Sequence, residues 1–179
     1  TEVFICYFPV EAEKKFQKWF GSTALLLPQI GADLGERMKN CFIDVFSKGF
    51  QRVVLIGSDS PDLPKKRIEQ AFVILQTRDT VLGPTVDGGY YLIGFHTNTF
   101  IQNVFEDIPW SNQTVFQETV MKIKKAHRSL GILPIWSNID TVGDLKNLIR
   151  RAKNTSFKSS KTMRYLHKHH IGLENDYEA

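Results

Sequence analysis

Carboxylates follow two segments of the chain that have the composition of buried β-strands. Asp59 comes two positions after the apolar run VVLIG, with Asp62 just beyond it, and Asp140 follows the run GILPIW. Carboxylate oxygens from different strand ends can converge on a hard cation such as Mg²⁺. Proteins usually bind this ion through carboxylates together with the phosphate oxygens of a substrate. Each acid alone is better explained as a turn residue or a helix cap. Taken together, the acids favour a cation site.

The segment VDGGYY places an acid and two glycines in what otherwise has the composition of a buried strand. Asp87 can bind a metal or a hydroxyl group of a ligand. Gly88 and Gly89 lack a Cβ, so they allow a ligand close to the backbone or a turn with positive φ. Tyr90 and Tyr91 point to opposite faces of a strand, which places one in the core and lets the other line a pocket. The alternative is a tight turn in which Asp87 accepts hydrogen bonds from nearby amides.

The order of periodicities predicts an α/β fold. Apolar runs predict strands at residues 2–8, 24–29, 52–59, 80–84, 90–95 and 131–136. Amphipathic patterns with capping residues predict helices at 11–20, 34–48, 64–75, 111–126 and 141–149. Strands that alternate with helices of this length form a mostly parallel sheet with helices on both faces. Ligands of such sheets bind beyond the carboxyl ends of the strands, which is where Asp59 and Asp140 lie.

The composition is that of one globular domain with a basic end. The 179 residues are 42% hydrophobic and 23% charged, enough for a sizeable core. The formal net charge of +4 comes from residues 150–170, which hold seven Lys or Arg and no acid. Residues 1–149 contain 16 basic and 16 acidic residues, a balance that excludes a nucleic-acid platform. We therefore predict a domain at 1–149 and a basic C-terminal extension at 150–179.

The two cysteines have neither the spacing of a metal motif nor the context of a nucleophile. Cys6 and Cys41 both lie in apolar runs, which predicts buried free thiols in a reducing compartment and hence a cytoplasmic protein. No apolar run approaches the roughly 18 residues of a membrane span, so no span is expected.

Five segments in the same order resemble one bacterial family of GT-A-fold proteins. They are QIGADLGERM, VVLIGSDSPDL, VLGPTVDGGYYLIGF, IPWSNQTVFQETV and NIDTVGDLKNL. The family is nucleotide-diphospho-sugar transferase-like, and its members are described as radical-SAM/selenodomain-associated transferases or as glycosyltransferases of arsenosugar biosynthesis. The resemblance extends from the start of the chain to about Ile149. It implies a three-layer α/β/α GT-A fold with a mostly parallel sheet and a nucleotide bound over the strand ends.

The resemblance also implies roles for individual residues. Asp59 of GSDSP matches the metal-binding acid at the strand end, with Mg²⁺ or Mn²⁺ as the ion. Asp140 of NIDT matches the acid that completes such sites in related nucleotidyltransferases. Asp33, Gly35 and Arg37 of GADLGER would lie near the nucleotide.

Two further residues belong to the expected site. Many glycosyltransferases hold the metal with Asp-x-Asp, whereas two residues separate Asp59 from Asp62 here. That departure weakens the match for Asp62 and keeps nucleotidyl transfer open.

Trp110 in DIPWSN can stack on a sugar or form a hydrophobic staple at a helix start, and both interpretations stay open.

Three functions follow from the resemblance. The first is metal-dependent transfer of a sugar from a nucleotide-diphospho-sugar to a small-molecule acceptor, with Asp87 as base or orienting group. The second is a guanylyltransferase-like nucleotidyl transfer from a nucleoside triphosphate. That reaction normally needs a glycine-rich loop with Lys or Arg, which residues 1–50 lack. The third is a nucleotide-binding domain without catalysis.

The resemblance predicts that this chain begins at a later point of the fold than members of the family do. Residues 1–8 resemble the family's second strand, because one helix and one short strand separate them from GADLGERM. We therefore expect these 179 residues to lack the first βα unit and to expose a sheet edge. Nucleotide phosphates would then bind weakly, since the loop whose amides hold them would be absent.

Overall fold

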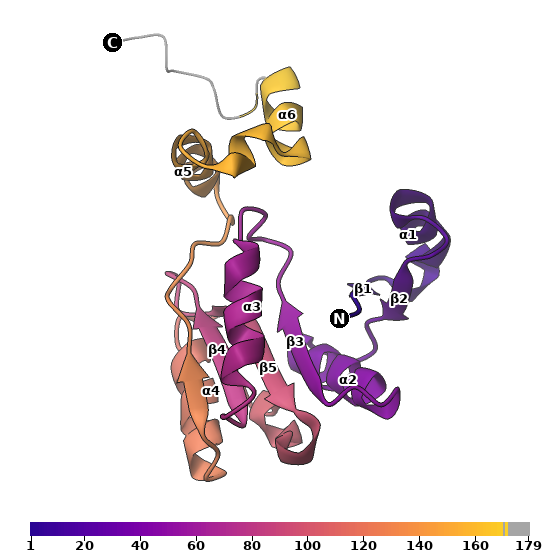
Figure 1. The fold of residues 1–179 in the computed structure, drawn as a ribbon, viewed down its shortest axis with the longest axis vertical. Coiled ribbons are helices and arrows are strands. Elements are labelled where there is room, and N and C mark those ends of the chain that lie inside the picture. Colours follow the sequence, from indigo (N-terminus) through magenta and orange to yellow (C-terminus); the bar gives the residue numbers. More distant parts are fainter. Residues whose placement is uncertain (170, 172–179) are drawn as a thin grey trace.

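The computed structural model describes residues 1–169 and 171 (Figure 1). Its strands are β1 (Phe4–Tyr7), β2 (Leu25–Pro28), β3 (Arg52–Ile56), β4 (Thr80–Pro84), β5 (Tyr90–His96) and β6 (Leu130–Ile132). Its α-helices are α1 (Glu13–Phe20), α2 (Leu34–Ser47), α3 (Lys65–Ile74), α4 (Val115–Lys125), α5 (Val142–Ala152) and α6 (Lys161–Lys168). Short 3₁₀ helices lie at Val10–Ala12, Thr97–Thr99, Gln102–Phe105 and Ser156–Ser159. None of the helices that the structure describes combines the length and the apolar character needed to cross a membrane.

The strands form two separate sheets. β1 pairs with β2 in parallel, and the other four strands pair in the order β3-β5-β4-β6. In this larger sheet β3, β4 and β6 share one direction, whereas β5 runs antiparallel to β3 and β4. Only residues 85–89 connect β4 to β5, too few for the crossover that parallel neighbours need. The expectation of a mostly parallel sheet therefore holds for three of these four strands, and β5 is the exception.

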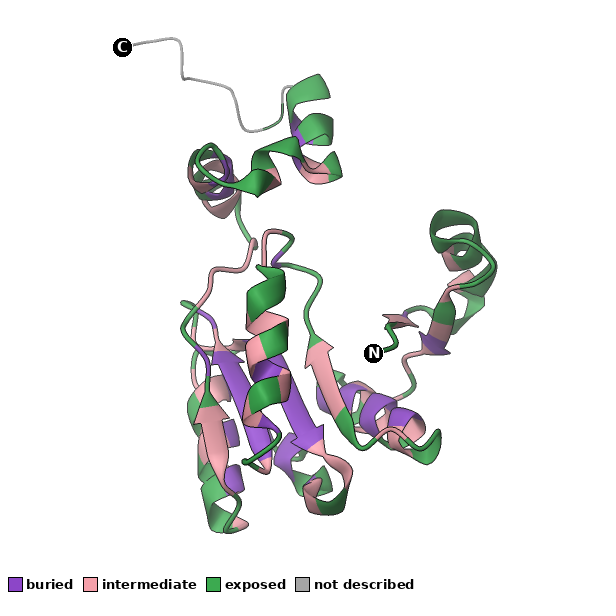
Figure 2. Cartoon of the chain, viewed as in Figure 1, coloured by how far each residue is buried: buried purple, intermediate pink, exposed green. Residues whose placement is uncertain are grey.

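Helices cover both faces of the four-stranded sheet. One core cluster, from α2, α4, β4 and β5, includes Met38, Phe42, Leu82, Ile93, Phe95 and Ile123. A second cluster, which contains α3, includes Ala71, Leu75, Val81 and Leu92. Because neighbouring residues of a strand point to opposite faces, Val81 and Leu82 place the two clusters on opposite sides of the sheet. Figure 2 shows the buried strands between these layers, which confirms the predicted three-layer α/β/α arrangement.

Local sequence signals set the helix ends as expected. Asp33 caps α2, since its Oδ1 accepts a hydrogen bond from the Glu36 amide at 2.8 Å. Gly49 follows α2 with φ +89°, a conformation that glycine adopts without strain. Thr141 and Asp144 form the predicted capping box at the start of α5. Asp33 and Thr141 thus mark where the loops before α2 and α5 end.

α5 and α6 form a small helical unit at the top of Figure 1. Their shared core cluster contains Leu148, Ile149, Ala152, Met163 and Leu166. The described part of the basic extension therefore contains a helix, α6, which packs on α5 through apolar residues. The predicted domain boundary at 149/150 falls inside α5, because the apolar face of that helix continues to Ala152.

Candidate active site at the strand ends

Three exposed carboxylates lie beyond the carboxyl ends of strands. Asp59 follows β3, Asp87 lies in the turn between β4 and β5, and Asp140 lies between β6 and α5. The Ile139 amide donates a hydrogen bond to the Asp59 carbonyl oxygen at 2.9 Å, which ties the loop before α5 to the end of β3. The acids from different segments therefore gather at one edge of the sheet.

The side chain of Asn138 joins two of these acids. Its Nδ2 donates to Oδ2 of Asp87 at 2.9 Å and also to Oδ2 of Asp140. One amide group thus holds carboxylates from the β4–β5 turn and from the start of α5 beside each other. We refer to Asp59, Asp87, Asn138 and Asp140 as the acidic cluster. Sequence analysis missed Asn138, and the only available signal was its place two residues before Asp140 in SNID.

The turn that carries Asp87 requires glycine at position 88. Gly88 has φ +91°, and a Cβ there would lie 2.0 Å from the Gln113 carbonyl oxygen. The Thr85 amide donates to the Gly89 carbonyl at 3.0 Å, and Asp87 Oδ1 accepts the Gly89 amide at 3.2 Å. The adjacent glycines therefore form a tight turn against the loop before α4. This is the second of the two interpretations of VDGGYY, and the turn presents Asp87 at the sheet edge.

Gly88→Ala is expected to lower the free energy of unfolding by about 2 kcal/mol. Alanine is strained at this positive φ, and its Cβ would clash with the Gln113 carbonyl oxygen. Gly143→Ala is the matched control, since its Cβ would contact only Thr141 Oγ1 at 3.5 Å and alanine favours a helix. Urea unfolding measures both variants. Equal stability of the two proteins would show that the turn accepts a side chain at position 88.

Asp87 is held in its charged form. Partial burial acts to raise the pKa of Asp87, but the hydrogen bonds from the Asn138 amide and the Gly89 N–H stabilise the carboxylate. These donors outweigh burial and hold the pKa of Asp87 below its ordinary value. Asp87 is therefore ionised at neutral pH.

The pKa of Asp140 is shifted in the opposite direction, above its ordinary value. Loss of hydration raises the pKa of Asp140, and the negative charges of Asp87, Asp59 and Asp144 raise it further. Asp140 is exposed, so solvent screens part of this repulsion. The carboxylates are nevertheless close enough to repel one another, and a bound cation would relieve that repulsion.

Asp140→Asn is expected to raise the melting temperature in chelator at neutral pH and to leave it unchanged below about pH 3. The folded pKa of Asp140 is raised, so its ionisation destabilises the fold increasingly as pH rises through that pKa. Asp144→Asn should do the reverse at neutral pH, because the Thr141 hydroxyl and amide lower the Asp144 pKa. Melting curves across this pH range measure both variants. Shifts of the same sign would contradict the assigned repulsion.

The donors of the acidic cluster suit Mg²⁺ or Mn²⁺, which prefer oxygen ligands. Among the described residues, no three His, Cys, Asp or Glu side chains form a group that could hold one ion. Asp87, Asn138 and Asp140 are nevertheless already in mutual contact. A half-turn of the Asn138 amide would present Oδ1 to a cation in place of Nδ2. With that rotation and with water ligands, the cluster fits a divalent ion.

Asp62 makes a different contact. Its carboxylate oxygens accept hydrogen bonds from Arg151 Nε at 2.6 Å and Nη2 at 3.0 Å, and its side chain is only 7% exposed. Trp136 Nε1 also lies 3.4 Å from Asp62 Oδ1. This geometry gives Asp62 a structural role, and its ligation of a metal stays a prediction. We refer to the Asp62–Arg151 pair as the clasp, because it fastens α5 to the loop after β3.

Asp33 and Arg37, expected near the nucleotide, both make contacts around the start of α2. Asp33 is the N-cap of that helix. Arg37 donates from Nε to the Gly31 carbonyl at 3.1 Å, and its guanidinium lies 4.0 Å from the centre of the Phe8 ring. These contacts explain the residue types without a ligand, and the nucleotide role stays a prediction.

Trp110 packs onto α2 and onto Tyr90. A Cβ on Gly35 would lie 2.7 Å from the Trp110 ring, so glycine allows the indole to approach the helix. The rings of Trp110 and Tyr90 meet edge to face, with centroids 6.5 Å apart. Burial raises the pKa of the Tyr90 hydroxyl, and Tyr91 is 2% exposed in the second core cluster. The packing explains Gly35, Tyr90 and Trp110, and sugar stacking stays a prediction.

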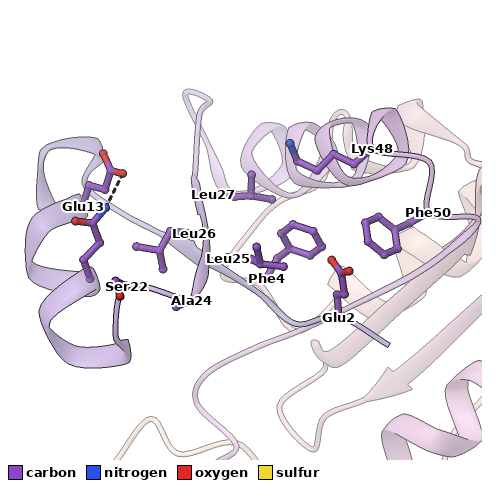
Figure 3. A pocket seen from close by; sticks show the side chains of 11 residues that line it. Glu2, Phe4, Glu13, Ser22, Ala24, Leu25, Leu26, Leu27, Lys48 and Phe50 are labelled. Atoms are coloured by element: carbon purple, nitrogen blue, oxygen red, sulfur yellow. Dashed lines mark hydrogen bonds between the residues drawn. The ribbon is translucent and has the colours of Figure 1, made fainter.

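A hollow of ≈ 520 Å³ lies apart from the acidic cluster (Figure 3). Its walls come from β1, β2, α1 and the segment after α2, and the lining includes Phe4, Leu25, Leu27, Lys48 and Phe50. No member of the acidic cluster lines it. The hollow therefore contributes nothing to the candidate site.

Comparison with known proteins agrees with the fold and the motifs. Residues 1–112 match the family model described as "Uncharacterized protein conserved in bacteria (DUF2064)". No match is found among the curated proteins. A crystal structure from Desulfovibrio desulfuricans G20, named a "putative nucleotide-diphospho-sugar transferase", matches with a TM-score of 0.91 and 42% sequence identity. That match covers 97% of this chain and 76% of the other. The chain therefore belongs to this bacterial family, and its fold is the GT-A α/β fold.

Proposed function

We propose that this chain transfers a sugar from a nucleotide-diphospho-sugar to a small-molecule acceptor with the help of a divalent cation. The observation that carries the proposal is the link from Asp87 through Asn138 to Asp140 at the strand ends. Ligands of α/β sheets bind at this edge. The substrate class is supported by the name of the similar protein from Desulfovibrio desulfuricans G20.

Asp87 and Asp140, with Asn138 after rotation of its amide and with water, are the residues that would hold Mg²⁺ or Mn²⁺, and Asp59 lies in the loop beside them. Each acid comes from a different loop, and main-chain hydrogen bonds at Ile139 and Gly89 fix two of those loops. A divalent cation bound there would neutralise the departing diphosphate. The mutual repulsion that raises the pKa of Asp140 supports this use of the cluster.

Asp87 is better suited to orient the acceptor than to remove its proton. An effective general base has a pKa near the working pH. The amides of Asn138 and Gly89 offset the effect of burial and hold the pKa of Asp87 below its ordinary value. Of the two roles that the sequence allowed, we therefore assign Asp87 the orienting role, in which its oxygens accept hydrogen bonds or bind the cation.

The products distinguish glycosyl transfer from nucleotidyl transfer. We expect the chain to release a nucleoside diphosphate when incubated with UDP-, GDP- or ADP-sugars and Mn²⁺, and to release no pyrophosphate from nucleoside triphosphates. Slow hydrolysis of the sugar donor gives the same diphosphate when no acceptor is present. Chelation of the cation should stop the release. Pyrophosphate release from a triphosphate, or diphosphate release that persists in chelator, would contradict the proposal.

A further inference from the structure

α6 carries positive charge on the side that faces away from α5. Its buried residues, Met163 and Leu166, pack on α5 in a shared core cluster. Residues at the spacing i, i+3, i+4 and i+7 lie on one face of a helix. On α6 the face opposite the buried residues is exposed, and it consists of Lys161, Arg164, Tyr165 and Lys168. We refer to these four residues as the basic strip.

No carboxylate neutralises the basic strip among the residues that the structure describes. The ion pairs of the described residues join side chains that lie outside α6. The sequence around the strip is basic as well, since residues 150–179 contain seven Lys or Arg and three Asp or Glu, a net charge of +4. Exposed cations gathered on one helix face attract a negatively charged partner.

The basic strip lies where a flat partner can contact it. Among the described elements, α6 stands at one end of the longest axis in Figure 1, and Figure 2 shows its outer side as exposed. Tyr165 is 59% exposed, and its ring lies beside the His169 imidazole, with ring centroids 4.4 Å apart. A tyrosine presents an apolar ring and a polar hydroxyl, which suits the headgroup level of a membrane between water and hydrocarbon.

We propose that the basic strip binds the protein peripherally to anionic lipid surfaces. Lysine and arginine side chains near such a surface each add to the attraction, and their flexible stems let the charges reach lipid phosphates. α6 lies on the surface and does not insert, because its apolar side is already buried against α5. Binding is weak and reversible, since stable anchoring requires a second signal.

The distribution of charge favours a lipid surface over a nucleic acid. Proteins that bind single-stranded nucleic acids follow the phosphate chain with a positively charged groove. Residues 1–149 hold equal numbers of acidic and basic residues, so the excess positive charge is confined to the helical unit at one end. The basic strip lies on the outer side of one helix, and a flat surface of uniform charge needs no groove to contact it.

Sedimentation of the full chain with vesicles tests the proposal, and it involves no sugar transfer. At about 0.02 M salt the protein should bind vesicles of about one part phosphatidylglycerol to two parts phosphatidylcholine at least about tenfold more tightly than vesicles of phosphatidylcholine alone. Binding should be lost at about 0.5 M salt, because salt screens exposed charges. Equal binding to the two kinds of vesicle, no binding to either, or binding that persists at the higher salt would overturn the proposal.

A triple variant tests whether the basic strip makes the contact. The variant combines Lys161→Gln, Arg164→Gln and Lys168→Gln. Its matched control removes the same charge from α4, with Lys122→Gln, Lys124→Gln and Lys125→Gln. The strip variant should bind the anionic vesicles at least about tenfold more weakly than the native chain, since each cation near the surface contributes about fivefold, and the control should change binding by less than about twofold. Equal losses in the two variants would show that net charge alone drives binding, which would overturn the role of the strip.

A competition experiment with the native chain separates the lipid surface from a nucleic acid, and it remains decisive even when a variant fails to fold. Single-stranded RNA, added at the same phosphate concentration as the anionic lipid, should leave most of the protein on the vesicles. Release of the protein into the supernatant together with the RNA would assign the basic strip to a nucleic acid and would overturn the proposal.

Discussion

An Arg151→Met variant is expected to lose about 3 kcal/mol of unfolding free energy. The substitution leaves the Asp62 carboxylate, which is 7% exposed, without the guanidinium that donates two hydrogen bonds to it. A buried charge that loses its partner remains without water to solvate it, which costs about 3 to 5 kcal/mol. The low end of that range applies here, because the Arg151 side chain is itself 28% exposed.

Arg150→Met is the matched control for the clasp. Arg150 is exposed, and its recorded side-chain contact is a 3.5 Å hydrogen bond to Asn147, so its loss should change stability by less than about 0.5 kcal/mol. Asp62→Asn combined with Arg151→Met should cost less than the two single changes added together, because each removes the same pair. Urea unfolding measures the native chain, the three single variants and the double variant. Equal losses for Arg150→Met and Arg151→Met would contradict the structural role of the clasp.

Asp87→Asn and Asp140→Asn are each expected to lower kcat/KM for sugar transfer at least tenfold, equivalent to about 1.4 kcal/mol. Each change would remove one of the charged oxygens that we propose as ligands of the cation. Asp44→Asn is the control, because Asp44 is an acid on α2 outside the cluster. Initial rates at several Mn²⁺ concentrations measure the effect.

The metal dependence of those rates separates a cation ligand from a merely structural residue. For Asp140→Asn the rate should rise again at high Mn²⁺ if the remaining donors still bind the ion weakly. Rates equal to that of Asp44→Asn at all Mn²⁺ concentrations would show that Asp140 takes no part in the reaction. A lower rate of sugar transfer, together with the raised melting temperature expected for Asp140→Asn in chelator, would separate function from stability at one residue.

Sequence patterns predicted the features that depend on neighbouring residues. Asp33 and the Thr141–Asp144 capping box act within one helical turn, so their spacing in the sequence is sufficient to identify them. The strand-end position of Asp59 and Asp140 follows from the order of the elements in an α/β fold. These features fixed most element boundaries and the edge of the sheet that carries the acidic cluster.

Contacts between distant residues could not be predicted in the same way. The clasp joins Asp62 to Arg151, 89 positions further along the chain, and no local pattern marks either residue as its partner. Asn138 reaches Asp87 across 51 positions, and its role depends on how the β4–β5 turn meets the loop before α5. The antiparallel direction of β5, in contrast, could have been predicted. The connection between β4 and β5 is visible in the sequence, and it is too short for a parallel crossover.

The central claim is that the acidic cluster binds one divalent cation and, through it, a nucleoside diphosphate. Titration of Mn²⁺ into the native chain, followed by the electron paramagnetic resonance signal of free Mn²⁺ with and without UDP, tests this claim most directly. The account predicts one bound ion whose affinity rises when UDP is added, and an affinity at least tenfold lower in the Asp87→Asn/Asp140→Asn double variant. A double variant that is folded and binds Mn²⁺ as tightly as the native chain would contradict the account.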